Sequence, residues 1–509
     1  MVIPRFSLCP LASGSLSQLP AKFLHAGLRK PYADVMAKEA NASLDAFDRG
    51  TLQKDLPGIS VALDRSAMSR WFQAELIGLD GSNQLQRCSL VSAILLEGCA
   101  VLRYELELID AVGRSTSTLV TGRVFPDASR AEAYAAERLI GLAAQVVGRV
   151  EVKPLTTPLA VVAELGMALY AYPIDGELPT LAAATDESIA GLAIEQLLRA
   201  NGLPDVDIQG CRAEPIHYNR RHRCMLRYGL DLVGGKSFAV YGKVTSDDSG
   251  ASIPRIVEAL TTTFTGAGVA LPECLGWHEE LQLVAFTEIP GAPRVAQLLK
   301  ARLRGDQSEG AVTLEDAVDM CGRIAAALHT SGLSLGDARP LETELARLRA
   351  NLSPIRRLSP ALGKQLGNLL EVVERRAASI PATGLCQCHG DFSYTQLIFD
   401  GPRAGLVDFD NFCRAEPALD LGQFLAYLRY AGIKARGGSS AAELRGPSED
   451  LAQRFATSYV SAGGRPEALD RVELYEATNL VRMAEHAWQN LKSRRLNQIV
   501  ALLEERLMA

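Results

Sequence analysis

Residues 388–399 read CHGDFSYTQLIF, and residues 406–410 read LVDFD. The apolar, β-prone runs at 397–399 and 405–407 are separated by DGPRA, which is typical of a turn. This pattern predicts a β-hairpin centred on Pro402, in which Leu397 pairs with Val407.

Polar side chains gather at the open end of the predicted hairpin. Gln396 falls opposite Asp408, and facing positions in a hairpin lie about 5 Å apart at Cβ. Asp391 is one loop away. Amide and carboxylate oxygens, completed by water and phosphate, are the ligands that hold Mg²⁺ at a nucleotide. The sequence therefore predicts a phosphoryl-transfer site.

The same motifs resemble those of the kinase-like small-molecule phosphotransferases, a family that includes aminoglycoside, choline and maltose kinases. The resemblance implies that Asp391 is the catalytic base for the acceptor hydroxyl, and that Gln396 and Asp408 are the metal ligands. The family usually has Asn where this chain has Gln396, and Gln keeps the amide oxygen on a longer side chain. The alternative is an Asp in a turn beside an ordinary hairpin.

The composition is that of an ordinary globular protein with room for about three domains. The 509 residues carry a net charge of −6, which disfavours nucleic acid as a main partner. We find no apolar segment of signal-peptide length at the start and no 18-residue apolar run, so we expect a cytoplasmic protein without a membrane partner. Cys386 and Cys388 form a lone C-x-C, which reduced thiols explain more simply than a metal site.

The first half of the chain contains an internal repeat. Residues 102–108 (LRYELEL) are echoed by residues 226–232 (LRYGLDL), and these are followed by GRV at 122–124 and GKV at 242–244. Each copy continues into a helix-prone segment and a later apolar run that ends in a Pro/Gly loop. Matching sequence motifs in the same order, at a nearly constant offset, indicate a duplicated unit.

The second copy resembles the small, β-rich lobe of the protein-kinase fold. The resemblance implies that Lys243 reaches the α- and β-phosphates of ATP, and that Glu258 on the next helix is its ion-pair partner. Phe286, Glu288 and Ile289 fall where the adenine base meets the hinge in that fold. The alternatives are a solvated edge-strand lysine for Lys243 and an exposed helix residue for Glu258.

The first copy lacks the chemistry of the second. It has Arg123 at the position of Lys243, and nothing between Ile174 and Gly202 resembles His-Gly-Asp. We therefore expect a degenerate small lobe kept for packing, substrate enclosure or formation of a homodimer. In the second copy no Gly-x-Gly-x-x-Gly loop precedes Lys243. The corresponding turn carries Arg220, Arg221 and Arg223, which either contact phosphates or form a solvated basic tip.

Other residues of the second half are expected to support the site. Residues 416–422 (EPALDLG) resemble a family phrase in which the acid, here Asp420, braces the catalytic loop, and its place before an apolar helix favours an N-cap. Asp410 is either an additional metal or substrate contact or a turn cap. Structural roles are expected for the remaining candidates, His329, Glu485, His486 and Trp488.

These features predict an α+β, bilobal protein-kinase-like fold with an additional degenerate N-terminal copy of the small lobe. The expected domains are an extension (1–40), the degenerate repeat (41–195), the small lobe (196–290) and a helical large lobe with the catalytic loop (291–509). A mobile loop is expected at 434–450.

The predicted function is an ATP- and Mg²⁺-dependent phosphotransferase acting on a hydroxyl of a small molecule such as a sugar, an aminoglycoside or an amino alcohol. The alternative, motivated by Gln396 and the missing glycine loop, is a pseudokinase that binds nucleotide without turnover.

Overall fold

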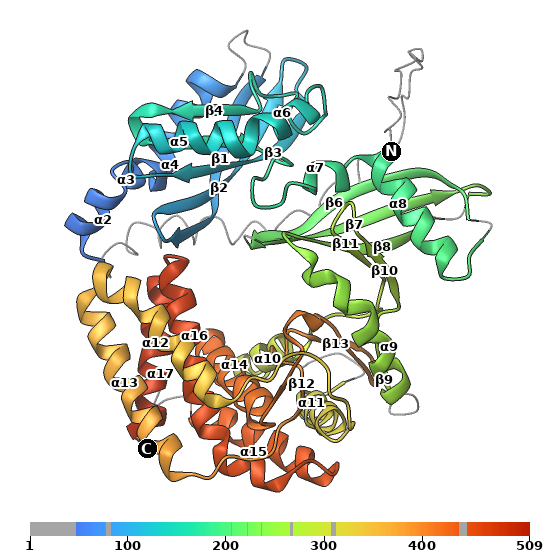
Figure 1. Ribbon diagram of the computed structural model, residues 1–509, viewed down its shortest axis with the longest axis vertical. Coiled ribbons are helices and arrows are strands. Elements are labelled where there is room, and N and C mark those ends of the chain that lie inside the picture. Colours follow the sequence, from blue (N-terminus) through green and yellow to red (C-terminus); the bar gives the residue numbers. More distant parts are fainter. Residues whose placement is uncertain are drawn as a thin grey trace, which may run out of the picture.

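A computed structural model describes residues 47–77, 83–204, 206–220, 222–235, 237–264, 268–306, 312–436 and 445–508. The predicted extension at 1–40 lies outside the described residues. Of the loop predicted at 434–450, both ends belong to helices, and residues 437–444 are not described. The described residues form a mixed helix and sheet fold with three bodies: two sheets with their helices, and a helical half (Figure 1).

The first body is an antiparallel five-stranded sheet with the order β1-β2-β3-β5-β4. Figure 1 shows α5 lying across one face of this sheet. Its strands are β1 (Asn83–Leu96), β2 (Cys99–Asp110), β3 (Ser115–Val124), β4 (Leu159–Val162) and β5 (Met167–Ala171). Its helices are α2 (Arg49–Asp55), α3 (Ile59–Leu63), α4 (Arg65–Trp71), η2 (Phe72–Leu76), α5 (Ala128–Tyr134), η3 (Ala135–Leu139), α6 (Ile140–Gln145) and η4 (Ala163–Leu165).

The second body has a sheet of the same plan, β6-β7-β8-β11-β10. Its strands are β6 (Ile208–Arg220), β7 (Arg223–Leu232), β8 (Ser237–Thr245), β10 (Cys274–His278) and β11 (Leu283–Thr287). Its helices are α7 (Leu181–Ala184), α8 (Glu187–Ala200), η5 (Asp248–Ser252) and α9 (Ile253–Phe264). The domain boundary expected at residue 195 falls inside α8, which packs against β6 and β10.

The two sheets also share their pairing register. Leu102 pairs with Gly122 in the first sheet, and Leu226 pairs with Gly242 in the second. The repeated sequence motifs thus lie on equivalent central strands of the two sheets. In both sheets the helix-containing connection leads to the edge strand, β4 or β10. The next strand, β5 or β11, then lies between that edge strand and β3 or β8.

A buried polar cluster joins the first body to the second. Arg103 donates to the carbonyl oxygen of Tyr218, the Tyr218 hydroxyl donates to Asp175 at 2.7 Å, and Arg103 lies 3.6 Å from Asp175. All three side chains are buried. Since a buried charge is tolerated only when it is paired and hydrogen-bonded, this cluster fixes how the two sheets meet.

The third body is helical and carries the motif of the sequence analysis. Its helices are α10 (Val295–Arg304), α11 (Leu314–His329), α12 (Leu341–Leu358), α13 (Pro360–Ser379), η6 (Phe409–Asn411), α14 (Ala418–Arg436), α15 (Arg445–Ser461), η8 (Pro466–Arg471), α16 (Val472–Gln489) and α17 (Ser493–Met508). Its short strands are β12 (Cys386–Cys388), β13 (Leu397–Asp400), β14 (Arg403–Leu406) and β15 (Cys413–Ala415); β14 also pairs with β9 (Val269–Ala270), which follows α9. In the described ranges, no helix combines the length and the apolarity needed to cross a membrane.

The start of the first body also contacts the helical half. The ring of Phe47 stacks on Trp488 of α16 with 5.2 Å between centroids, and the Asp48 amide donates to Leu358 at 2.7 Å. Arg357 pairs with Asp55 of α2. The first body therefore touches both other bodies.

Candidate active site

The hairpin forms with a register one residue from the predicted one. Leu397 pairs with Leu406, and the Val407 amide donates to the Gln396 carbonyl at 3.1 Å. The prediction that Gln396 lies opposite Asp408 was therefore wrong. The cause is a tight turn at Gly401-Pro402, with Gly401 at φ 55°, which centres the hairpin between these residues and not on Pro402.

Gln396 nevertheless reaches both predicted acids. Its side-chain Nε2 lies 3.3 Å from Asp408 Oδ2 and 3.3 Å from Asp391 Oδ2. Asp408 has a left-handed backbone conformation, φ 69° and ψ 67°, immediately after the hairpin. Such a conformation is uncommon for a residue with a side chain and is found at functional sites. The structure thus brings Asp391, Gln396 and Asp408 together.

Asp420 braces the loop that carries Asp391. Its carboxylate accepts hydrogen bonds from the backbone amides of His389 at 2.7 Å and Gly390 at 2.9 Å, and it contacts His329 Nε2 at 3.2 Å. Burial opposes the charge, but the hydrogen bond from His329, the nearby His389 ring and the hydrogen bond from the His389 amide hold the pKa of Asp420 below its usual range. The expected N-cap was wrong, because α14 begins at Ala418 and Asp420 lies in its first turn.

Gly390 permits this loop to turn. It has φ 74°, and a Cβ at this position would lie 2.0 Å from the carbonyl oxygen of Asn411. We expect Gly390→Ala to lower the free energy of unfolding by at least ~1–3 kcal/mol, because the strained backbone and the close approach cannot both be kept. The measurement is denaturant unfolding. The matched control is Gly141→Ala in α6, where a Cβ meets nothing within 4 Å and no loss is expected; equal effects of the two variants would contradict this assignment.

Asp391 is held from both sides by amides. Gln423 of α14, which is fully buried, donates to Oδ1, and Gln396 donates to Oδ2. Burial raises the pKa of Asp391 above its usual range, and the positive charge of Arg482 on α16 is the largest influence against that rise. When it is ionised, a carboxylate with a raised pKa is a better proton acceptor than an ordinary one.

Lys243 reaches from the second sheet to the helical half. Its Nζ lies 2.7 Å from Asp408 Oδ1 and 2.7 Å from Asp410 Oδ1, and only 5% of the residue is exposed. Arg223 pairs with the same two acids. Burial alone would raise the pKa of Asp408, but the charges of Lys243 and Arg223 outweigh burial and lower it to about 2. Asp408 is therefore ionised at neutral pH, as a metal ligand must be.

The structure does not bring Glu258 to Lys243. Glu258 is exposed on α9, and the carboxylates that contact Lys243 are Asp408 and Asp410. The sequence left open whether Asp410 is a contact in the site or a turn cap, and its ion pairs with Lys243 and Arg223 place it in the site. The side chains of Arg220 and Arg221 lie outside the described residues.

The predicted adenine-binding residues lie where the second sheet meets the hairpin. Phe286 lies half-buried in β11, and Glu288 is exposed and accepts a hydrogen bond from the Tyr241 hydroxyl at 2.9 Å. Ile289 lies close to Gly405 of β14. Just beyond, the Phe399 amide donates to Ala292 at 2.9 Å, so this linker is bonded to the hairpin that carries the site.

Sequence reasoning missed two residues that contact or influence Asp391. Gln423 lies three residues after Asp420, so both lie on one face of α14; this spacing is a signal that the sequence did contain. Arg482 has no such signal, because α16 meets α14 only through the packing of the helical half.

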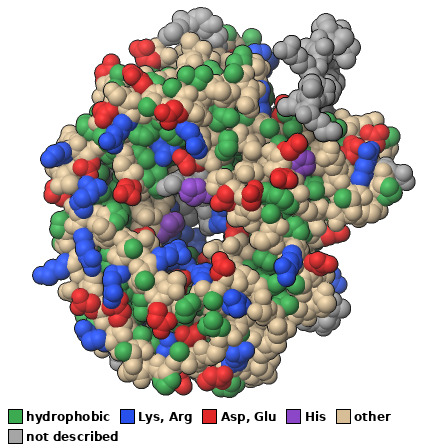
Figure 2. Space-filling model, in the orientation of Figure 1, with side chains coloured by type: hydrophobic (Ala, Val, Ile, Leu, Met, Phe, Trp, Pro, Cys, Tyr) green, Lys and Arg blue, Asp and Glu red, His purple; other side chains and the backbone are tan. Residues whose placement is uncertain are grey.

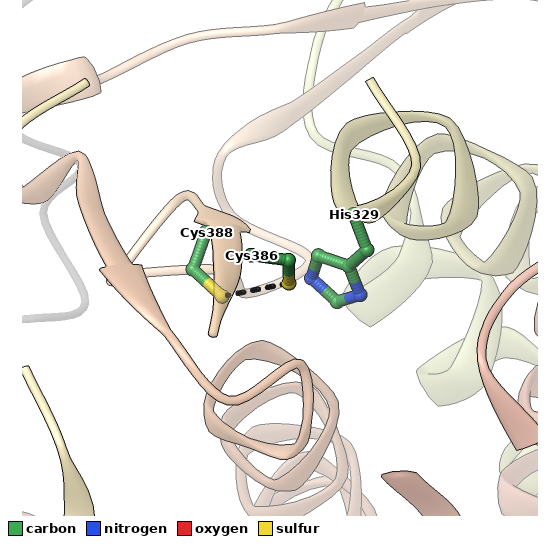
Figure 3. A group of neighbouring side chains, drawn as sticks. All are labelled: His329, Cys386 and Cys388. Atoms are coloured by element: carbon green, nitrogen blue, oxygen red, sulfur yellow. Dashed lines mark hydrogen bonds between the residues drawn. The ribbon is translucent and has the colours of Figure 1, made fainter. Parts of the chain in front are cut away.

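His329 lies beside a buried pair of thiols (Figure 3). Cys386 Sγ and Cys388 Sγ are 3.8 Å apart, and these atoms and a ring nitrogen of His329 lie within 4.8 Å of one another. Both ring nitrogens of His329 have other partners, Asp420 and the Tyr459 hydroxyl at 3.1 Å. These contacts account for His329 as a structural residue, as expected, and every cysteine in the described ranges is free.

The other residues expected to be structural divide into two groups. Glu485 is buried and accepts from Asn351 at 3.1 Å, and Trp488 is buried and donates to Ser359 at 2.8 Å. His486 is exposed, so core packing does not account for it. It lies on α16, one turn beyond Arg482.

The sequence matches a known family over part of its length. The model of the phosphotransferase enzyme family matches residues 248–455, which include Asp391, Gln396 and Asp408 but not Lys243. This match covers less than half of the chain, and it agrees with the family resemblance carried by the motifs and with the prediction of a phosphotransferase enzyme. No curated protein matches the chain.

Several solved structures resemble this one weakly. Glucosamine kinase in one crystal form is 16% identical, with 82% of this chain and 94% of that chain covered and a TM-score of 0.46. A choline/ethanolamine kinase family protein from Mesorhizobium loti is 15% identical, with 62% and 97% covered and a TM-score of 0.39. An aminoglycoside phosphotransferase from Streptomyces rimosus is 19% identical, with 57% and 97% covered and a TM-score of 0.34.

Proposed function

We propose that the chain is an ATP- and Mg²⁺-dependent kinase that transfers the γ-phosphoryl group to a hydroxyl of a small molecule. The observation that carries the proposal is the continuous set of contacts from Asp391 through Gln396 and Asp408 to Lys243. It joins a proton acceptor, oxygen ligands and a phosphate-binding cation across two bodies of the molecule. Positioning and charge stabilisation are what phosphoryl transfer requires of a protein.

The donor set fits a magnesium ion. The Gln396 amide and the ionised Asp408 carboxylate lie within hydrogen-bonding distance of each other, and Mg²⁺ takes one or two such protein oxygens, with waters and phosphates completing the shell. A bound ion would screen the negative charge of the phosphates. Gln396 would then present its Oε1 to the ion, since the two ends of an amide exchange by rotation.

Each residue of the site has its own role in the phosphoryl transfer. Asp391 accepts the proton of the acceptor hydroxyl as that oxygen forms its bond to the γ-phosphorus. The bond from the γ-phosphorus to the bridging oxygen breaks, and its electrons leave with ADP. Lys243 and Arg223 hold phosphate oxygens, and Gln423 keeps Asp391 oriented toward the acceptor. Phe286, Glu288 and Ile289 would meet the adenine base. Glu258 would reach Lys243 only after a change in the ion pairs described above.

We also propose that the first body is a degenerate copy of the small lobe. The shared strand order and register of the two sheets support this proposal. In the first body Arg123, at the position of Lys243, pairs with Glu177 at 2.5 Å and donates to the Tyr134 hydroxyl at 3.0 Å. Its charge is therefore used within its own body, and packing or substrate enclosure is the role we assign to this copy.

A nucleotide-binding protein without turnover is the second candidate. It is favoured by one observation, the engagement of Lys243 with both Asp408 and Asp410. Acceptor-dependent release of ADP, measured with a panel of sugars, aminoglycosides, amino alcohols and hydroxy acids, distinguishes the two. A kinase releases ADP faster with one acceptor class than without acceptor, whereas a binding protein retains ATP and gives the same background rate with all of them.

Gln396 offers a test of the proposed metal site. We expect Gln396→Ala to raise the Mg²⁺ concentration needed for ADP release sharply, because an oxygen donor is lost. Gln396→Asn should be intermediate and partly rescued by Mn²⁺, because Mg²⁺ demands near-octahedral geometry and the shorter side chain moves the donor by about 1 Å. The measurements are ADP release and direct Mn²⁺ binding, each titrated with the metal. Identical metal curves for the wild type and both variants would exclude Gln396 as a ligand.

A further inference from the structure

Helices α14, α16 and α17 pack against one another and carry a set of polar and aromatic side chains, and α14 contacts Asp391 through Gln423. On α14 and α16 they recur at helical spacing, and the two helices pack against each other. Gln423 begins the row on α14 and contacts Asp391 directly. We call the five half-buried or exposed residues that follow it the acceptor wall: Tyr427, Tyr430, Arg482, His486 and Arg495.

The two arginines of the acceptor wall make contacts other than ion pairs. Arg482 donates to the side chain of Asn479 at 2.7 Å, and the guanidinium of Arg495 lies 5.2 Å from the ring centroid of Tyr430. Neither forms an ion pair with a carboxylate within the described ranges. In contrast, the buried or half-buried arginines behind the wall are each paired with glutamates; these are Arg429, Arg471 and Arg506.

The charges of these two arginines act on Asp391 and on the side chains near it. The positive charge of Arg482 acts on Asp391, and those of Arg482 and Arg495 act on Tyr427. The same two cations and Lys492 act on His486. The charge of Arg482 also acts on Glu485, the buried acid on α16, which accepts a hydrogen bond from Asn351. Figure 2 shows Lys and Arg side chains gathered along the lower side of the central hollow, which the helical half forms. The whole chain, by comparison, has a net charge of −6.

We propose that the phosphate acceptor carries an anionic group, a carboxylate or a phosphate ester, in addition to the hydroxyl that is phosphorylated, and that Arg482 and Arg495 bind this group. The inference rests on the proposed function, since it concerns the acceptor of the same site. A guanidinium without a carboxylate partner presents paired N–H donors that match a carboxylate or a phosphate. The same charges repel a polycation, so aminoglycosides and amino alcohols are disfavoured acceptors.

The experiment compares matched acceptors that differ in charge. Glucose, glucosamine, gluconate and glucose 6-phosphate form one series, and glycerol, choline and glycerate form a second; each is assayed for acceptor-dependent ADP release. We expect an acid or a phosphate ester to be the best acceptor, and the comparison of gluconate with glucose 6-phosphate identifies which anion is bound. Arg482→Gln and Arg495→Gln should each raise the KM for that acceptor about 10- to 100-fold, the loss typical of a hydrogen bond to a charged group, with a smaller change in kcat. The control is Arg323→Gln, at an exposed position on α11, which should change neither constant.

If no acceptor in the series is phosphorylated, calorimetric titration with malonate and with inorganic phosphate tests whether Arg482 and Arg495 bind an anion. The wild type should bind one of these anions, and Arg482→Gln combined with Arg495→Gln should not. Preferred turnover of a neutral or cationic acceptor, or equal binding of both anions by the wild type and the double variant, would overturn the inference while leaving the proposed function intact. Absence of ADP release with every acceptor, together with Arg-dependent anion binding, would count against the kinase and not against the anion site.

Discussion

Asp391→Asn is expected to lower turnover about 10²- to 10⁴-fold, the usual contribution of a general base, while the fold and the affinity for ATP are retained. The amide has the shape of the carboxylate but cannot accept the hydroxyl proton. Thermal unfolding and calorimetric titration with ATP verify that the variant is folded and binds nucleotide, and ADP release in the presence of an acceptor gives the rate.

The dependence on pH supplies a second criterion for Asp391. Burial raises the pKa of this acid, and the base must be ionised, so turnover in the wild type should fall as the pH is lowered through that raised value. The fall should begin at a higher pH than an ordinary carboxyl group would give. Near wild-type turnover by Asp391→Asn, or the same acid limb in the variant and the wild type, would exclude Asp391 as the base.

Lys243→Ala is expected to weaken ATP binding about 10- to 100-fold, the range for losing a hydrogen bond to a charged group. The lysine is buried where the second sheet meets the helical half, and its charge is poorly screened there. Its loss also removes the main cation that keeps the pKa of Asp408 low. The Mg²⁺ concentration needed for ADP release should therefore rise as well.

Arg123→Ala is the matched variant in the first body. Arg123 has the same place in its sheet, but it pairs with Glu177 and Tyr134, far from the hairpin in the sequence and in a separate body. We expect a lower melting temperature from the lost ion pair and an unchanged affinity of the folded protein for ATP. Calorimetry with ATP on both variants tests the assignment, which fails if nucleotide affinity follows Arg123.

Local sequence predicted the parts of the site that depend on order and spacing. The residues from Asp391 to Asp408 lie on one loop and one hairpin, so their proximity is set by a few backbone turns, and the family match agrees with them. The hairpin register was missed by one residue because Pro402 was taken as the centre of the turn. The longer Gln396 side chain still reaches both acids from its new position.

Contacts between distant segments could not be predicted in the same way. The partners of Lys243 were taken from the expected fold as Glu258, yet the short distances are to Asp408 and Asp410, which are more than 160 residues away in the chain. The influence of Arg482 on Asp391 depends on how α16 packs against α14. The cluster of Arg103, Asp175 and Tyr218 depends on the meeting of two separate sheets.

The central claim is that the contacts from Asp391 to Lys243 form a working phosphoryl-transfer site. Its most direct test follows the label from ATP labelled in the γ-phosphate, incubated with Mg²⁺ and the acceptor panel, for the wild type and Asp391→Asn. We predict that the wild type moves the label onto an acceptor hydroxyl and that Asp391→Asn, although it binds ATP, does not. Label that stays on ATP with every acceptor while the wild type binds the nucleotide would contradict the account and identify a nucleotide-binding protein instead.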